Sequence, residues 1–186
     1  MPYAVGQAVP VTLLGTKVTA WVALNQDEHR RRAAIGLGPV ADPALLEMLL
    51  NLPLGIPVSD PVAWVEASRL PEGIVERGQD SLAITRLLDS PLFINAVVVT
   101  ASPGHDLQAV ASASLFASYC HRWVATARPE VADVTMLEAK LCGVGLVNGT
   151  GQVLLGAGPP MEPIIDGWTW LMREKAYRRV LQQRRP

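Results

Sequence analysis

The chain has 186 residues, of which 49% are hydrophobic and 18% charged, and its formal net charge at pH 7 is -1. This size and composition predict one folded domain and exclude intrinsic disorder as the main state. There is neither an apolar run of about 18 residues nor an N-terminal signal, which excludes a spanning helix and predicts a cytoplasmic protein.

The first 36 residues predict a hairpin followed by a short helix. Two runs rich in Val, Thr and Trp lie on either side of Gly15, Thr16 and Lys17, as in two antiparallel strands joined by a turn. Asn25 then provides a helix cap, and acidic residues precede arginines in the order that the helix dipole favours, up to Gly36.

The middle of the chain predicts three short helices. The pairs Asp42-Pro43 and Asp60-Pro61 each combine a capping carboxylate with a proline that suits the first helical position. A third helix is expected to begin near Asp80 or Ser81 and to end before Pro91.

Residues 92–101 form the best strand in the sequence. Their apolar, β-branched run without polar alternation predicts a central strand that is buried on both faces. Ser102 and Pro103 then suggest the cap and the first residue of a long helix that extends to about residue 127.

The last third predicts a helix over 129–142, a second hairpin over 144–156 and a terminal helix from about Asp166. We therefore expect an α/β or α+β fold, a small mixed sheet of two hairpins and the central strand near 92–101, covered by several helices. Residues 1–165 are assigned to a single globular domain, and residues 166–186 to an amphipathic helix and basic tail.

Glu138 and Lys140 resemble the Glu-x-Lys pair of metal-dependent nucleases, in which a strand places both side chains on one face. The apolar residues around the pair recur at helical spacing, and on a helix the two side chains point to different sides. We therefore interpret the pair as part of a solvated helix face, while a strand position beside a second carboxylate would indicate a nuclease.

Ser102, His105 and Asp106 lie where the central strand runs into the following helix. Such a junction presents free amides and a positive dipole end, which bind phosphate or an oxyanion. Only half of a nucleophile-elbow motif is present. Helix capping explains these residues more simply, although the junction remains the best place for a small anionic ligand.

No metal or cofactor site is expected. Cys120 and His121 are adjacent and would diverge on a helix, and the glycines near residue 149 match neither a dinucleotide fingerprint nor a P-loop. Cys120 and Cys142 are predicted to be reduced thiols in the core.

The C-terminal segment is the most unusual part of the sequence. Residues 173–186 hold six basic residues and one acid, a net charge of +5, which leaves -6 for the preceding 172 residues. Trp168, Trp170 and Tyr177 lie in or next to this segment and could anchor a partner. The basic residues are Arg173, Lys175, Arg178, Arg179, Arg184 and Arg185.

Two interpretations of this segment stay open. It is either a surface helix with solvated charges or a docking surface. No set of residues in the sequence combines the side chains that catalysis needs. We therefore expect a non-catalytic binding or assembly subunit of an intracellular complex, and the amino-acid composition suggests a bacterial one. The partner would be a protein or a second copy, with nucleic acid as the other option. The alternative function is a nuclease-like or phosphate-handling enzyme that uses Glu138 and Lys140 or the 102–106 turn.

Overall fold

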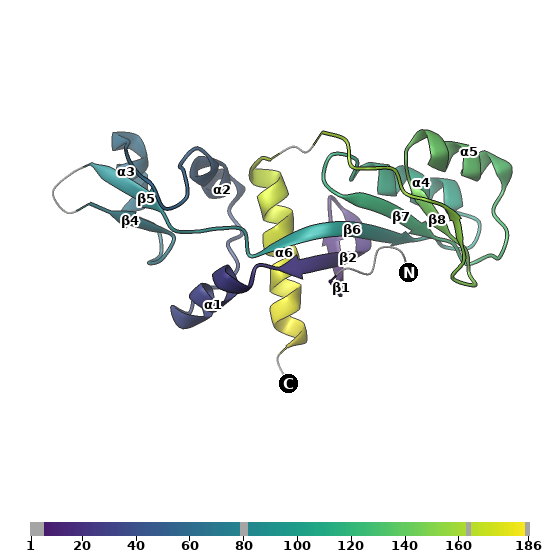
Figure 1. Cartoon of the computed structure of the whole chain (residues 1–186), viewed down its shortest axis with the longest axis horizontal. Helices are drawn as coiled ribbons and strands as arrows, with labels where there is room; N and C mark the ends of the chain where they lie inside the picture. Colours follow the sequence, from purple (N-terminus) through teal and green to yellow (C-terminus); the bar gives the residue numbers. More distant parts are fainter. Residues whose placement is uncertain (1–5, 79–81, 163–164, 185–186) are drawn as a thin grey trace. The chain divides into compact units, whose positions relative to one another are not determined.

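The computed structural model describes residues 6–78, 82–162 and 165–184 (Figure 1). Its contacts divide into two compact units. The six-stranded unit takes its described residues from 1–23, 93–164 and 179–186, and the three-stranded unit from 24–92 and 165–178. The predicted α/β class is confirmed, while the proposed boundary at residue 165 stays a prediction.

The six-stranded unit is built on one mixed sheet that contains both predicted hairpins and the predicted central strand. Neighbours in the β1-β2 and β8-β9 pairs are antiparallel, whereas β6, β7 and β8 are parallel. In spatial order the strands are β1 (Gln7–Leu13), β2 (Thr16–Leu24), β6 (Leu92–Thr100), β7 (His121–Ala125), β8 (Gly145–Val147) and β9 (Val153–Leu155).

The first hairpin turns at Leu14 and Gly15, one residue earlier than expected. Both residues have positive φ angles, 46° and 75°. A two-residue turn of this kind matches the twist of the flanking strands, and glycine adopts it without steric cost. The turn therefore fixes the register in which Leu13 pairs with Thr16.

Strand β6 is buried on both faces, as its apolar run predicted. Ala96, Val97, Val98 and Val99 are all buried. Parallel neighbours need crossover helices, and here these are α4 (Asp106–Ser114), which packs on β7, and α5 (Asp133–Leu141), which packs on α4 and β8.

The prediction of one long helix after Pro103 is wrong, because α4 ends at Ser114 and β7 begins at His121. Strand β7 contains Trp123 and Val124, and its backbone pairs with β6 on one side and β8 on the other. Trp123 packs against Gly145 of β8, where any Cβ atom would collide with the indole ring. Pairing within the sheet outweighs the local helical pattern.

The three-stranded unit combines a small antiparallel sheet with helices. Its strands lie in the order β3 (Pro57–Ser59), β5 (Ala83–Arg86) and β4 (Val75–Arg77). Its helices are α1 (Gln26–Ala34), α2 (Pro43–Leu50), α3 (Pro61–Ala67) and the larger part of α6 (Gly167–Gln183).

The predicted helix caps of this unit are confirmed. The Asn25 side chain accepts a hydrogen bond from the amide of Glu28. Asp42 and Asp60 each accept hydrogen bonds from two amides of the first turn, with a proline at the first helical position. These carboxylates satisfy donors that a helix leaves unpaired, which explains why both helices begin there.

The third predicted helix of the middle region is wrong. Residues 83–86 form β5 instead, between β3 and β4, so its backbone groups pair on both sides. Ile84 is fully buried, which the short apolar run could not distinguish from a helix position. The expected start at Asp80 and Ser81 lies outside the described residues.

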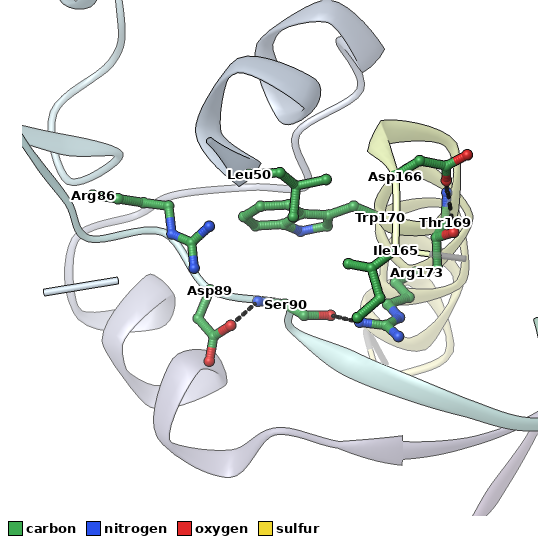
Figure 2. A pocket seen from close by; sticks show the side chains of 9 residues that line it. All are labelled: Leu50, Arg86, Asp89, Ser90, Ile165, Asp166, Thr169, Trp170 and Arg173. Atoms are coloured by element: carbon green, nitrogen blue, oxygen red, sulfur yellow. Dashed lines mark hydrogen bonds between the residues drawn. The ribbon is translucent and has the colours of Figure 1, made fainter. Parts of the chain in front are cut away.

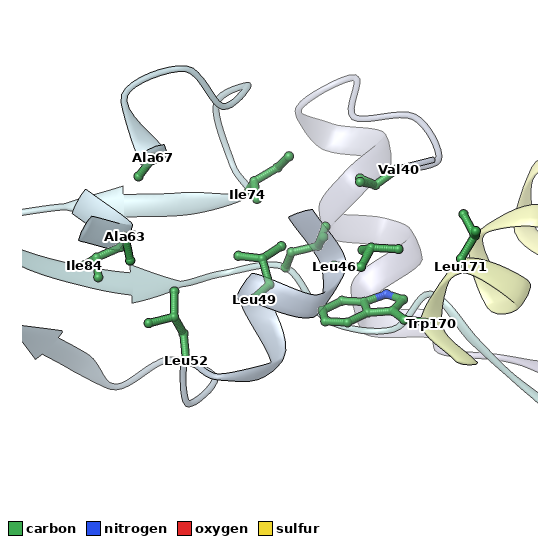
Figure 3. Close-up of a cluster of buried hydrophobic side chains, with 11 residues drawn as sticks. Val40, Leu46, Leu49, Leu52, Ala63, Ala67, Ile74, Ile84, Trp170 and Leu171 are labelled. Atoms are coloured by element: carbon green, nitrogen blue, oxygen red, sulfur yellow. The ribbon is translucent and has the colours of Figure 1, made fainter. Parts of the chain in front are cut away.

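A buried apolar cluster holds this unit together (Figure 3). Side chains from α2, α3 and β5 meet Trp170 and Leu171 of α6. Burial of this many large side chains is the main favourable contribution to folding. The first half of α6 is therefore part of a core. The cluster comprises Val40, Leu46, Leu49, Leu52, Ala63, Ala67, Ile74, Ile84, Leu88, Trp170 and Leu171.

Candidate functional site

Helix α6 carries most of the predicted partner-binding residues, and its start agrees with the sequence. The Asp166 carboxylate accepts hydrogen bonds from the amide and the hydroxyl of Thr169. Gly167 lies so close to Pro43 and Glu47 of α2 that a side chain there would collide with them. Capping and this close contact fix where the helix begins.

The inner face of α6 is buried, which corrects the expectation that Trp170 and Tyr177 serve as surface anchors. Trp170 is 4% exposed and Tyr177 only 1%. Trp170 belongs to the apolar cluster, and the Tyr177 hydroxyl lies 2.9 Å from Nδ1 of His29. Neither ring is available to a partner unless the fold opens.

Glu174 lies on the same inner face and forms the centre of a charged cluster. Arg32, which is fully buried, donates hydrogen bonds to both Glu174 carboxylate oxygens at 2.7 and 2.8 Å. Glu174 also accepts from the Val40 amide and from Nε1 of Trp170. Because every oxygen is paired, this acid is structural and adds no charge to the surface.

Glu28 completes this cluster from α1. It accepts hydrogen bonds from Arg31 at 2.7 and 2.8 Å and from Arg32 at 2.7 Å. Burial alone would raise the pKa of Glu28, but the hydrogen bonds and positive charges of these two arginines outweigh burial and lower it. Glu28 therefore stays ionised and balances Arg32.

The outer face of α6, defined here by Trp168, Lys175 and Arg178, is exposed. Trp168 is 57% exposed, and the other two side chains lie two to three turns further along the helix. Among the described residues, no ion pair involves Lys175 or Arg178.

The remaining predicted residues of the segment differ in exposure. Arg179 near the end of α6 and Arg184 just after it are exposed, and Arg179 donates a hydrogen bond to Gln182. Arg173 is half-buried and contacts the Ser90 hydroxyl at 3.4 Å. Arg185 lies outside the described residues.

Ser102 and His105 line a cavity of about 340 Å³ at the end of β6, together with Gln108 and Ser112 of α4. Ser102 is not the helix cap that the sequence predicted. Its carbonyl accepts the His105 amide, and α4 begins only at Asp106, with no side-chain cap. The Ser-Pro-Gly segment forms a turn before the helix instead.

Glu138 and Lys140 lie on α5, as the helical spacing predicted. Both side chains are exposed, and the Glu138 carboxylate accepts a weak hydrogen bond from the Cys142 thiol at 3.6 Å. The strand arrangement that a nuclease needs is therefore contradicted for this pair.

The two cysteines are free thiols with different environments. Cys120 is buried just before β7, and burial raises its pKa to about 12. Cys142 is partly exposed at the end of α5, so its predicted place in the core is wrong. Burial and the neighbouring Glu138 also raise the pKa of Cys142, which makes both thiols poor nucleophiles at neutral pH.

Two negative findings concern the described part of the chain. Within 6–78, 82–162 and 165–184, no three His, Cys, Asp or Glu side chains gather closely enough to hold a metal ion. His121 starts a strand, not a helix turn, and its Nδ1 lies 3.1 Å from the Gly158 carbonyl. No helix among these residues is both long and apolar enough to cross a membrane.

The pairing of Arg32 with Glu174 was missed by the sequence reasoning. One signal was available, because Glu174 lies four residues after Trp170 and three before Tyr177, on the apolar face of the helix. Its partner is 142 residues away in the sequence, so no local pattern indicates the pair.

No protein-family model, no curated protein and no solved structure matches the chain.

Proposed function

We propose that the protein is a non-catalytic binding or assembly subunit that docks an acidic protein partner on the outer face of α6. The observation that supports this is the separation of charge within the helix. Its acid, Glu174, is buried against Arg32, while Lys175 and Arg178 are exposed without an ion pair among the described residues. The outer face therefore presents positive charge only.

An acidic protein suits this face better than a nucleic acid. Residues 1–172 carry a net charge of -6, which repels an extended polyanion such as DNA or RNA. A local acidic patch on a protein would meet the few basic side chains without approaching the rest of the chain. Such charge complementarity chiefly raises the association rate.

Trp168 would supply the apolar anchor. Interface energy is concentrated in a few residues, among which Trp and Arg are enriched. Trp168 is half-exposed although large apolar side chains are usually buried, and it shares the outer face with Lys175 and Arg178. A partner that covered the indole would bury apolar area and place its acids beside the two cations.

The electrostatic part is tested with an oligo-glutamate peptide as the probe, titrated into the full chain at low salt. The double substitution Lys175→Ala and Arg178→Ala should weaken binding about tenfold, and binding to the parent chain should fall as salt rises. The matched control is Arg69→Ala with Arg128→Ala, which removes the same charge from exposed positions on other segments. Equal losses in both double variants would contradict a specific face.

The natural partner can be identified by replacing Trp168 with a benzophenone-bearing amino acid in the producing cells. We expect a cross-linked protein whose attached peptide is acidic, and loss of the cross-link when Lys175 and Arg178 are alanines. The same photoprobe at Leu137, an exposed apolar position on α5, is the control. A cross-link that survives loss of both cations would contradict the proposal.

A second function is favoured by the cavity at Ser102 and His105. In parallel α/β sheets, ligands bind outside the carboxyl ends of the strands, where a helix begins, and this cavity lies there. Phosphate handling through this turn is the alternative proposal. Inorganic phosphate should then shift the amide signals of residues 105–108 in an NMR titration, and His105→Ala should reduce the shifts. Unchanged spectra would eliminate it.

A further inference from the structure

A second cavity, of about 170 Å³, lies within the three-stranded unit (Figure 2). Leu50, Ile165 and Trp170 provide apolar walls. Arg86 and Arg173 provide two guanidinium groups, which Figure 2 shows on either side of Ser90. The cavity is independent of the outer face of α6, because Trp170 and Arg173 lie on the opposite side of the helix.

The Arg86 guanidinium is incompletely satisfied. Its Nη1 donates to the Leu49 carbonyl at 2.8 Å, and the group lies 5.5 Å from the centre of the Trp170 ring. Its Nε is buried and has no hydrogen-bond partner, and Arg86 forms no ion pair with a described residue. Burial lowers the pKa of Arg86, although nearby Asp89 opposes this.

A partly buried guanidinium whose N–H groups lack acceptors is unfavourable. A guanidinium offers five N–H donors in a planar fork that matches a carboxylate. A carboxylate seated in the cavity would accept hydrogen bonds from the terminal guanidinium N–H groups of Arg86, which lines it. The Arg86 guanidinium lines the cavity and donates a single hydrogen bond to a described residue, so its position points to an anionic ligand.

The acids that face the cavity limit the ligand's charge. Asp89 accepts hydrogen bonds from the Ser90 amide at 2.6 Å and from the Asn25 side chain at 3.2 Å, and Asp166 caps α6. Two carboxylates beside two guanidinium groups leave no net positive charge. A ligand with one negative charge is therefore favoured over a phosphate dianion or a pyrophosphate.

The size and the apolar walls define the rest of the ligand. A cavity of about 150 Å³ holds a benzene molecule, so this one suits about six to eight non-hydrogen atoms. We propose that it binds a small monocarboxylate, whose carboxylate contacts Arg86 and whose short apolar group packs on Leu50 and Trp170.

The test uses isovalerate as the probe, titrated into the ¹⁵N-labelled full chain. We expect saturable binding in the millimolar range that shifts the Trp170 indole signal. Isovaleramide, which has the same shape without the charge, should bind about tenfold more weakly. Equal binding of acid and amide, no saturable shift, or tighter binding of inorganic phosphate would each overturn the proposal.

Variants locate the site. Arg86→Gln should weaken isovalerate binding about tenfold, whereas Arg77→Gln should leave it unchanged. Arg77 is the matched control because it also stacks on a tryptophan, 5.3 Å from the Trp64 ring centre, but does not line the cavity. Equal affinities of the two variants would overturn the assignment, and the comparison of acid with amide needs no variant at all.

Discussion

The two faces of α6 contain the same kinds of residue in different roles. On the inner face, Trp170 packs in a core and Glu174 neutralises Arg32. On the outer face, Trp168 is half-exposed and Lys175 has no ion pair among the described residues. An aromatic or charged residue in a basic segment is therefore informative about binding only once its contacts are known.

The largest effect is expected from removing the acid of the inner face. Glu174→Ala leaves Arg32 fully buried with its charge only partly balanced, and it also removes the acceptor of the Val40 amide. Breaking a buried pair in this way costs about 3–5 kcal/mol of unfolding free energy. Urea unfolding measures the loss. Glu66→Ala, an exposed acid on α3, should change stability by less than about 0.5 kcal/mol.

The two tryptophans sharpen the comparison directly. Trp170→Ala should cost about 3–5 kcal/mol, because it removes a buried ring from the apolar cluster. Trp168→Ala should stay within about 0.5 kcal/mol, since its ring is mostly exposed. Thermal and urea unfolding of the two variants decide the matter. Similar losses for both would mean that the outer face is also structural.

A smaller effect depends on pH. The pKa of Glu28 is lower in the folded state than in the unfolded chain, where it is about 4.3. Its stabilising contribution is therefore complete above that pH and is lost as the pH falls through the lower folded-state pKa. Glu28→Gln should cost about 1–3 kcal/mol at neutral pH and progressively less in acid. If the difference in unfolding free energy between the parent chain and the Glu28→Gln variant did not vary with pH, the ionised state of Glu28 in this cluster would be contradicted.

The parts of the fold that depend on local rules could be predicted from the sequence. Caps at Asp42 and Asp60 use neighbouring amides, and the strand near residue 96 shows its burial in an unbroken apolar run. Short segments with mixed patterns could not be predicted. Residues 83–86 and 121–125 became strands because each is hydrogen-bonded between two others, which local sequence does not encode.

The candidate sites depend on even less local information. The basic character of the C-terminal segment was visible in the sequence. Which of its side chains face solvent depends on α1 and α2, because these helices cover the inner face of α6. The Arg86 cavity gave no sequence signal, since Leu50, Arg86 and Trp170 come from three distant segments. Contacts between distant residues decide which polar groups stay unsatisfied.

The central claim is that the inner face of α6 stabilises the fold and the outer face binds. The most direct measurement is the affinity of the charge-reversed variant, Lys175→Glu with Arg178→Glu, for the oligo-glutamate peptide at low salt. We predict that binding is lost while the unfolding free energy changes by no more than about 1 kcal/mol, because both positions are exposed. Unchanged binding, with a loss of stability as large as that of Glu174→Ala, would contradict the claim.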